Sequence, residues 1–266
     1  MKIHLVTSIE TKGYHAYCID NHISLADHPE KLSFVSHCLD AESYHSIEQN
    51  DRQSAIKTQG GRGSGGHAVG IQSILANLSP GEINVVTDTD CVLLVKGWDT
   101  ILNDLMKEYK IVGTTYEDIG GFSSGDSLTQ TFKRIPNFTW VALSPEYDWK
   151  FDASCDKHNN LQIDTQELSE TFNLPIGYNL FREPIWRLPV YIRENNIRHL
   201  PLKFVRPTSG DAKAILTGQD YHTEYQLNDG TPFVAHQRGS MSKAFRSHPL
   251  SSTFYDACDN YLSRMK

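Results

Sequence analysis

The sequence lacks the features that mark several classes of protein. It has no surplus of basic residues, since 25 Lys and Arg stand against 32 Asp and Glu, and the formal net charge is −7. Proteins that bind nucleic acid through its phosphates normally carry the opposite balance. The longest apolar run, Cys91–Val95, is far shorter than the roughly 20 residues of a membrane-spanning helix. We therefore expect no nucleic-acid partner and no membrane span.

Cysteine is also sparse. The five cysteines are odd in number, lie far apart and form no C-x-x-C pair, which argues against a disulfide scaffold and against a structural zinc site. The segment Met1–Thr7 is too short and polar for a secretory signal, and it predicts a first strand instead. Together these features predict a protein of the reducing cytoplasm.

The first 115 residues alternate between strand and helix patterns. Apolar residues recur along Trp98–Tyr109 at the spacing of one helical face, and His67–Leu78 also predicts a helix. The alternation predicts an α/β fold with a mostly parallel sheet flanked by helices, and it places ligands at the carboxyl ends of the strands. After residue 115 the pattern becomes irregular, up to a closing helix. The predicted strands are Lys2–Thr7, Lys31–His37, Glu82–Thr87 and Lys110–Thr115, and the closing helix is Leu250–Met265.

Two carboxylates follow the third predicted strand directly, in the motif Asp88-Thr89-Asp90. The turn at the end of a strand can bring both side chains onto one ligand, although within the strand neighbouring side chains point to opposite faces. Mg²⁺ and Mn²⁺ need such oxygen ligands, and phosphates and water complete their coordination. Two Asp at this spacing also occur by chance on solvated loops, but the position after a strand favours a metal site.

Several further motifs occur in order along the chain. They are Gly66–Ile71, Asn77, Asp88-Thr89-Asp90, Gly97-Trp98-Asp99, Glu183–Asn195 and Ala235–Ser240. In this order they resemble GT-A fold glycosyltransferases of the family 2-like, D-x-D type. The resemblance covers residues 1–115 well and the remainder in patches. It implies a GT-A, Rossmann-like fold with a nucleotide-sugar-binding half at 1–115. Residues 116–266 are then the acceptor-binding and metal-completing half of the same domain.

The resemblance also implies an activity and a metal. A hexosyltransferase of this kind moves a sugar from a nucleoside-diphosphate sugar to a hydroxyl of a glycan or small-molecule acceptor, with inversion. In the family, the second Asp of D-x-D and a C-terminal His bind Mn²⁺ or Mg²⁺, which carries the donor diphosphate. The matching residues here are Asp90 and His236, with Asp88 near the ribose or the metal. The alternative for His236 is a satisfied histidine on a strand.

Strand ends and the start of a helix suggest further donor contacts. Thr7, Ser8 and Asp40 follow the first two predicted strands, so we expect them to contact the nucleoside. Gly66 and His67 open the next predicted helix, whose amides could face a phosphate or a base. A plain flexible connection explains these glycines equally well.

The sign of the charge reverses locally near the C-terminus. From Gly230 to Tyr255 there is no acidic residue, whereas Arg238 and Lys243 are cationic. A diphosphate leaving group needs cationic neutralisation, so we expect these two side chains at the donor phosphates. The alternative is a solvated basic loop.

The catalytic base has two candidates. Inverting transfer needs a carboxylate that accepts the proton of the attacking hydroxyl. Glu183 has the matching place in the resemblance, where it replaces the usual Asp, and Glu170 is the second candidate.

Other interpretations compete with this one. Asp88–Leu93 fits the signature of haloacid-dehalogenase-like phosphotransferases, with Asp88 as the nucleophile, although that motif normally follows a first strand. A non-catalytic sugar- or nucleotide-binding module would keep the pocket and need no base. Gly61-x-Gly63-x-x-Gly66 is formally a dinucleotide fingerprint. We set the fingerprint aside because it must follow a strand, whereas Asp51–Gln59 is polar.

Overall fold

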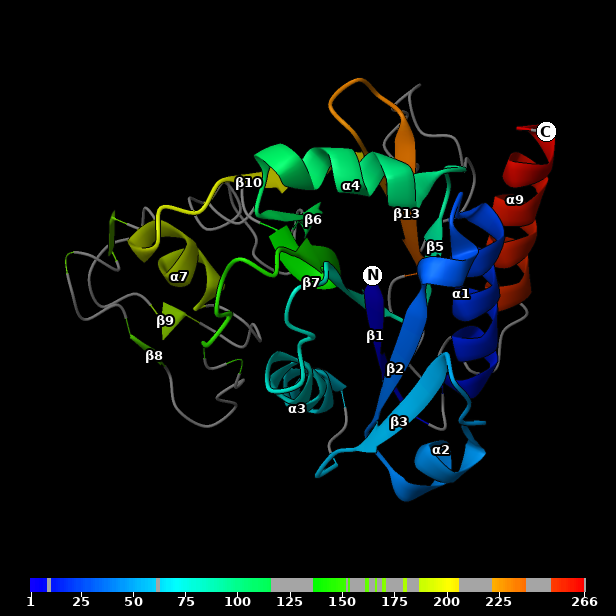
Figure 1. The fold of residues 1–266 in the computed structure, drawn as a ribbon, viewed down its shortest axis with the longest axis horizontal. Coiled ribbons are helices and arrows are strands. Elements are labelled where there is room, and N and C mark those ends of the chain that lie inside the picture. Colours follow the sequence, from blue (N-terminus) through cyan, green and yellow to red (C-terminus); the bar gives the residue numbers. More distant parts are fainter. Residues whose placement is uncertain are drawn as a thin grey trace.

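A seven-stranded sheet forms the centre of the molecule (Figure 1). The computed structural model describes residues 1–8, 11–60, 63–115, 136–151, 153, 161–162, 166, 169–170, 179–180, 187–205, 222–237 and 250–265. The strand order is β10-β6-β7-β4-β1-β2-β3, and every pair is parallel except the two that include β7. The strands are β1 (Lys2–Thr7), β2 (Ser33–Cys38), β3 (Gln53–Lys57), β4 (Asn84–Asp88), β6 (Ile111–Thr115), β7 (Pro136–Leu143) and β10 (His199–Pro201).

Helices cover both faces of this sheet, as the sequence predicts. On one face α1 (Lys12–Leu25) and α4 (Trp98–Glu108) enclose a core that also holds alternate residues of β1, β4 and β7. On the other face α3 (Gly63–Leu75) and α7 (Leu188–Glu194) pack on the intervening residues. This division follows from strand geometry, because successive side chains point to opposite faces. The mostly parallel α/β architecture is thus confirmed.

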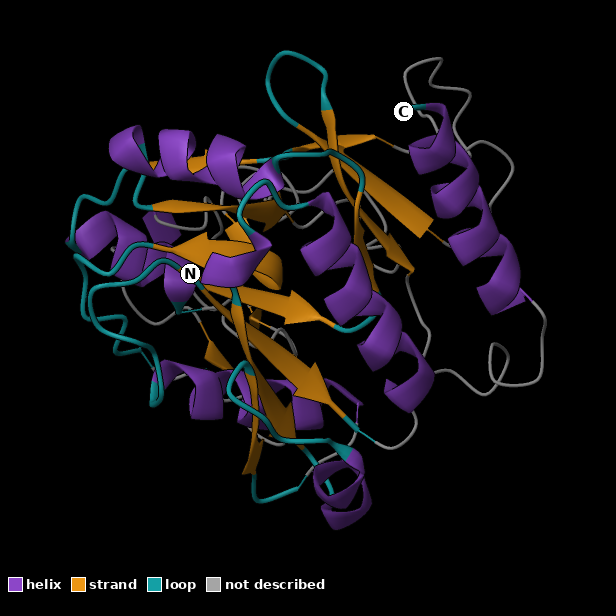
Figure 2. Cartoon of the chain, turned by 45° about the vertical axis from the view of Figure 1, so that its right-hand side comes forward, coloured by secondary structure: helices purple, strands orange, loops and turns teal. Residues whose placement is uncertain are grey.

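A second, antiparallel sheet adjoins the first (Figure 2). It has four strands in the order β11-β12-β13-β5. Its strands are β5 (Cys91–Leu93), β11 (Lys203–Val205), β12 (His222–Gln226) and β13 (Pro232–Gln237), and the helix α9 (Leu250–Arg264) packs on it. Shorter elements are α2 (Ala41–Ser46), η2 (Pro29–Lys31), β8 (Leu161–Gln162) and β9 (Asn179–Leu180). Because β5 comes early in the chain and β13 late, this sheet joins residues that are far apart in the sequence.

Two expectations need correction. The segment that we expected to lack a strand contains β3, a polar strand at the edge of the sheet that pairs with β2. Its polarity follows from its position, because an edge strand has one neighbour and its side chains are exposed or half-buried. The region after residue 115 is also more regular than its pattern suggests, since it supplies β7 and most of the second sheet.

The strand β3 also removes the ground on which the dinucleotide fingerprint was set aside. The glycine run does follow a strand and open a helix, because α3 begins at Gly63. In the sheet, however, β3 is separated from β4, the strand that follows α3, by β2 and β1. The fingerprint belongs to a compact βαβ unit, so sheet topology now argues against it.

The cysteines among the described residues are all buried. Cys18, Cys38, Cys91 and Cys258 are buried free thiols, and Cys155 lies outside the described residues. Among the helices of the described ranges, none is both long and apolar enough to cross a membrane.

Candidate functional site

The site forms where three parallel strands end on one edge of the central sheet. Pairing of β4 with β1 and of β1 with β2 aligns their carboxyl ends, so Asp88 lies beside the ends of the other two strands. The chain then turns through Thr89 and Asp90 into β5. Asp88 is half-buried and Asp90 is buried. Strand β4 and the turn after it therefore place both carboxylates at the edge where ligands of parallel α/β sheets bind.

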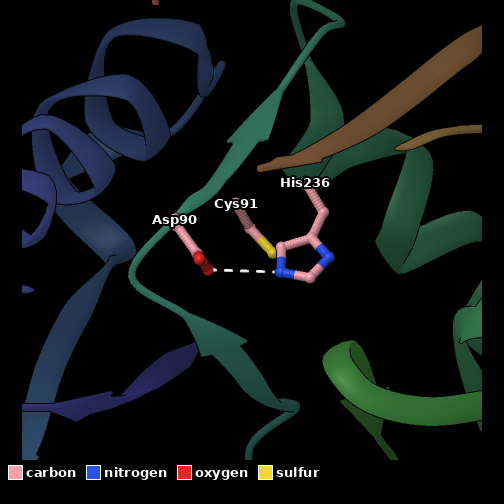
Figure 3. Close-up of side chains that lie close together, drawn as sticks. All are labelled: Asp90, Cys91 and His236. Atoms are coloured by element: carbon pink, nitrogen blue, oxygen red, sulfur yellow. Dashed lines mark ion pairs between the residues drawn. The ribbon is translucent and has the colours of Figure 1, made fainter. Parts of the chain in front are cut away.

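Asp90 and His236 converge across the second sheet (Figure 3). In the antiparallel pairing of β5 with β13, His236 lies opposite Cys91, and the amide of Gln237 donates to the carbonyl of Asp90 at 3.1 Å. This register brings His236 Nε2 to 3.4 Å from Asp90 Oδ1, with side chains only 15% and 10% exposed. The sequence resemblance had named these two residues as a pair, and the fold brings them together.

Cys91 completes a cluster with Asp90 and His236, because single ligand atoms of the three lie within 4.8 Å of one another. Its thiol donates to the carbonyl of Thr139 at 3.4 Å. Burial, and then the charges of Asp90 and Asp88, raise the pKa of the Cys91 thiol well above its ordinary value. Soft sulfur ligands suit ions such as Zn²⁺, whereas Mn²⁺ and Mg²⁺ take hard ligands, so for these two cations the carboxylate and the imidazole are the relevant donors.

Asp88 contacts the first turns of α3. Its Oδ1 lies 3.0 Å from His67 Nε2, and both side chains are about one quarter exposed, at 23% and 24%. The helix can approach so closely because Gly70 faces β1: a Cβ there would lie 2.5 Å from the side chain of Val6. Gly66 is buried in the first turn of the same helix. Sequence and packing thus hold His67 against Asp88.

Three buried polar atoms of the second sheet and α9 have no hydrogen-bond partner in the described part of the chain. They are Thr223 Oγ1, Gln237 Oε1 and the hydroxyl of Tyr255. Thr223 lies opposite His236 in the pairing of β12 with β13 and shares its face of the sheet, whereas Gln237, the next residue of β13, points to the other face. Buried polar groups in proteins are nearly always hydrogen-bonded, so such atoms mark a place where water, an ion or a ligand belongs.

The donor set fits a divalent cation. A carboxylate with a neighbouring imidazole, and with positions left for water and phosphate, matches the way catalytic cations are held by few protein ligands. The unpartnered polar atoms nearby can hydrogen-bond the water or phosphate oxygens that such a cation carries. The residues present therefore suit Mn²⁺ or Mg²⁺ bound by Asp90 and His236.

Solved structures of GT-A type glycosyltransferases are similar to this chain. A mannosyltransferase of Pyrobaculum calidifontis in complex with GDP-Man and Mn²⁺ is 17% identical over 55% of this chain and 44% of its own, with a TM-score of 0.36. The galactosyltransferase LgtC in complex with donor and acceptor sugar analogs is 10% identical over 55% of this chain and 58% of its own, with a TM-score of 0.36.

TarS of S. aureus in complex with UDP is 15% identical over 53% of this chain and 46% of its own, with a TM-score of 0.34. The chain thus spans less than two thirds of the length of each of these proteins. No known protein family and no curated protein matches the sequence.

The residues predicted to contact a nucleoside lie at the expected strand ends, where they also make local contacts. Thr7 Oγ1 lies 3.4 Å from Thr11 Oγ1, and Thr11 Oγ1 accepts from the amide of Ser8 at 3.0 Å. Asp40 is the N-cap of α2, where its Oδ1 accepts from the amide of Ser43 at 2.6 Å. The side chains of Thr7 and Asp40 and the backbone amide of Ser8 thus make contacts within the same loops that were predicted to contact the ligand.

Of the candidate bases and the basic side chains predicted to contact phosphate, the structure describes only Glu170. Glu183, Arg238 and Lys243 lie outside the described residues. Glu170 is exposed, accepts from Gln166 Nε2 at 3.0 Å and lies 3.7 Å from the guanidinium of Arg193.

Sequence reasoning missed Cys91, Thr223, Gln237 and Tyr255 as members of the site. A signal existed for Cys91, which follows the D-x-D motif directly. Thr223 and Gln237 enter through the register of the second sheet, and that register cannot be read from residue spacing. The described chain also has a cavity of about 1120 Å³ between α3 and residues 144–151, but Asp88, Asp90 and His236 do not line it.

Proposed function

We propose that this protein is a metal-dependent glycosyltransferase that moves a sugar from a nucleoside-diphosphate sugar to an acceptor hydroxyl. The observation that carries the proposal is the pairing of Asp90 with His236 at 3.4 Å. Both residues were named from a sequence resemblance, and they lie far apart in the sequence. The carboxyl-end location, the parallel α/β fold and the unpartnered polar atoms around the pair support the same function.

In this mechanism the protein binds and orients the donor. Asp90 and His236 hold the cation, which when bound neutralises the diphosphate leaving group. Asp88, fixed by His67, faces the ribose or the water around the cation. Arg238 and Lys243 add positive charge at the phosphates. The nucleoside lies against Thr7, Ser8 and Asp40 at the neighbouring strand ends.

The catalytic base comes from the part of the protein that binds the acceptor. Glu183 takes the proton of the acceptor hydroxyl as its oxygen attacks the anomeric carbon, and the sugar is transferred with inversion. Glu183→Gln keeps the size of the side chain and removes its basicity, so kcat should fall on the order of 10² to 10⁴-fold while donor binding is unchanged. Glu170→Gln is the matched variant, and a loss confined to it would move the base to Glu170.

The function is tested with a panel of nucleoside-diphosphate sugars and acceptors, with and without Mn²⁺. The expected result is metal-dependent release of UDP or GDP together with a glycosylated acceptor, and NMR of the new glycosidic bond reports inversion. Donor binding without transfer to any acceptor would indicate a binding module. Phosphorylation of Asp88, seen by mass spectrometry after incubation with phosphodonors, would indicate a phosphotransferase.

A further inference from the structure

The contacts of the Tyr255 hydroxyl on α9 do not explain why the residue is a tyrosine. The oxygen is buried and makes no hydrogen bond within the described residues. Leaving a buried hydroxyl without a partner costs free energy, because the group loses its hydrogen bonds to water and gains none. Phenylalanine at this position would avoid that cost, so the hydroxyl calls for an explanation beyond packing.

The Tyr255 ring cannot easily move to relieve this cost. It stacks on Tyr14 of α1 at a centroid distance of 5.6 Å and packs against Tyr17 at 4.4 Å. The neighbouring Phe254 is buried in a cluster with Val92 of β5 and Ala235 of β13. Val92 and Ala235 face α9, whereas their neighbours Cys91 and His236 point to the other face of the sheet. Tyr255 is placed near the D-x-D turn by α1, because Cys18, the residue after Tyr17, has its Sγ 4.0 Å from the carbonyl oxygen of Asp88.

The charge of Asp90 acts on this hydroxyl. Burial, and next the charge of the nearby Asp90, raise the pKa of Tyr255 far above its ordinary value, with smaller contributions from Cys18, Tyr14 and Cys91. The group thus keeps its proton and offers it to an acceptor. The adjacent Tyr17 provides a contrast, since its hydroxyl donates to Asp259 at 2.6 Å.

We infer that the Tyr255 hydroxyl donates a hydrogen bond to an oxygen of the ligand held at Asp90 and His236. This inference rests on the proposed function and makes α9 a part of the donor site. The accepting oxygen is carried either by a water on the cation or by a phosphate of the nucleoside diphosphate. In both cases the ligand supplies the partner that the described residues do not.

The test compares Tyr255→Phe with Tyr17→Phe, which removes a partnered hydroxyl from the same interface of α1 and α9. Isothermal titration measures binding of Mn²⁺ alone and of UDP and GDP in the presence of Mn²⁺, and thermal unfolding is measured without ligand. Tyr255→Phe should weaken binding by about tenfold, the effect of one hydrogen bond. It should also raise the Tm of the free protein by about 2 to 4 °C. Tyr17→Phe should lower the Tm and leave binding unchanged.

The two titrations distinguish the sources of the oxygen. Weaker binding of Mn²⁺ alone assigns the contact to a metal-bound water, whereas a loss confined to UDP or GDP assigns it to a phosphate. If the wild-type protein binds its ligands and Tyr255→Phe binds them equally well, the inference is wrong and the proposed function stands. If the wild-type protein binds neither Mn²⁺ nor a nucleoside diphosphate, both are wrong.

Discussion

Two groups of buried polar side chains in this protein differ in how completely they are hydrogen-bonded. Beneath α3, His4 Nε2 donates to Asn84 Oδ1 at 3.0 Å, His4 Nδ1 lies 3.2 Å from His37 Nε2, and His37 Nδ1 lies 2.9 Å from Ser73 Oγ. The Asn84 amide group donates to the carbonyls of Ser79 and Glu82, which fixes its oxygen as the acceptor. Both ring nitrogens of each histidine therefore have a partner.

The group around Asp90 and His236 is incomplete by comparison. Three buried polar atoms of the second sheet and of α9 lack a partner in the described part of the chain. A complete network stabilises and specifies a core, whereas an incomplete one costs stability until a ligand completes it. The contrast assigns a structural role to the His4–His37 group and a binding role to the Asp90–His236 group.

The largest expected effect follows from removal of Asp90. Asp90→Ala should abolish Mn²⁺-dependent donor turnover and weaken Mn²⁺ binding by more than the roughly 10 to 100-fold that outer contacts contribute. The Tm should change little, because removing a buried charge offsets the lost contacts. Isothermal titration with Mn²⁺ and thermal unfolding measure the two effects separately.

His236→Ala is the matched variant and should show a milder loss, because the cation keeps its other ligands. Full turnover by Asp90→Ala would overturn the metal assignment. A large fall in Tm with unchanged metal binding would make the Asp90–His236 group structural, like the His4–His37 group.

Sequence patterns predicted the central sheet better than the second sheet. The strands β1, β4 and β6 and the helix α4 lie within two residues of their expected bounds, because their apolar residues form strong local patterns. The edge strand β3 was missed because polar residues satisfy an edge strand as well as a loop. The second sheet was missed because its pairing joins β5 to β13, and local spacing carries no signal of such a contact.

The site was predictable to the extent that a motif named its residues. Asp90 and His236 were named by resemblance, and their proximity depends on a register that only the fold supplies. Tyr255 was beyond prediction, since one tyrosine in an amphipathic helix looks like any core residue. A missing hydrogen bond distinguishes it, and no pattern of residue types records one.

The buried histidines, which include the His4–His37 group, should make the stability depend on pH. Burial lowers the pKa of His4, His15 and His22 to about 4 and that of His37 to about 3. As the pH falls below about 6.5, the unfolded chain therefore takes up protons that the folded protein does not. The stability is complete above that pH and decreases toward pH 4, by about 1.4 kcal/mol per pH unit for each histidine.

Urea unfolding at pH 7, 6 and 5 measures this loss, and one substitution assigns it. His37→Gln removes one titrating ring, so the free energy of unfolding should depend less steeply on pH by about 1.4 kcal/mol per pH unit. His45→Gln, at an exposed position, should leave the dependence unchanged. Equal slopes for His37→Gln and the wild type would show that the His4–His37 group does not stay neutral in the folded state.

The smallest expected effect concerns Asp40, which has both a structural contact and a predicted role in binding. Its carboxylate caps α2 through the amide of Ser43, and the sequence also predicts a contact with the nucleoside. Asp40→Ala should lower the free energy of unfolding by about 1 kcal/mol through loss of the cap. Asp40→Asn should keep the cap, because asparagine is as good an N-cap, and should weaken UDP and GDP binding through loss of the charge. If Asp40→Asn binds both nucleotides as tightly as the wild type, Asp40 acts as a helix cap alone, and the nucleoside contact must come from another strand end.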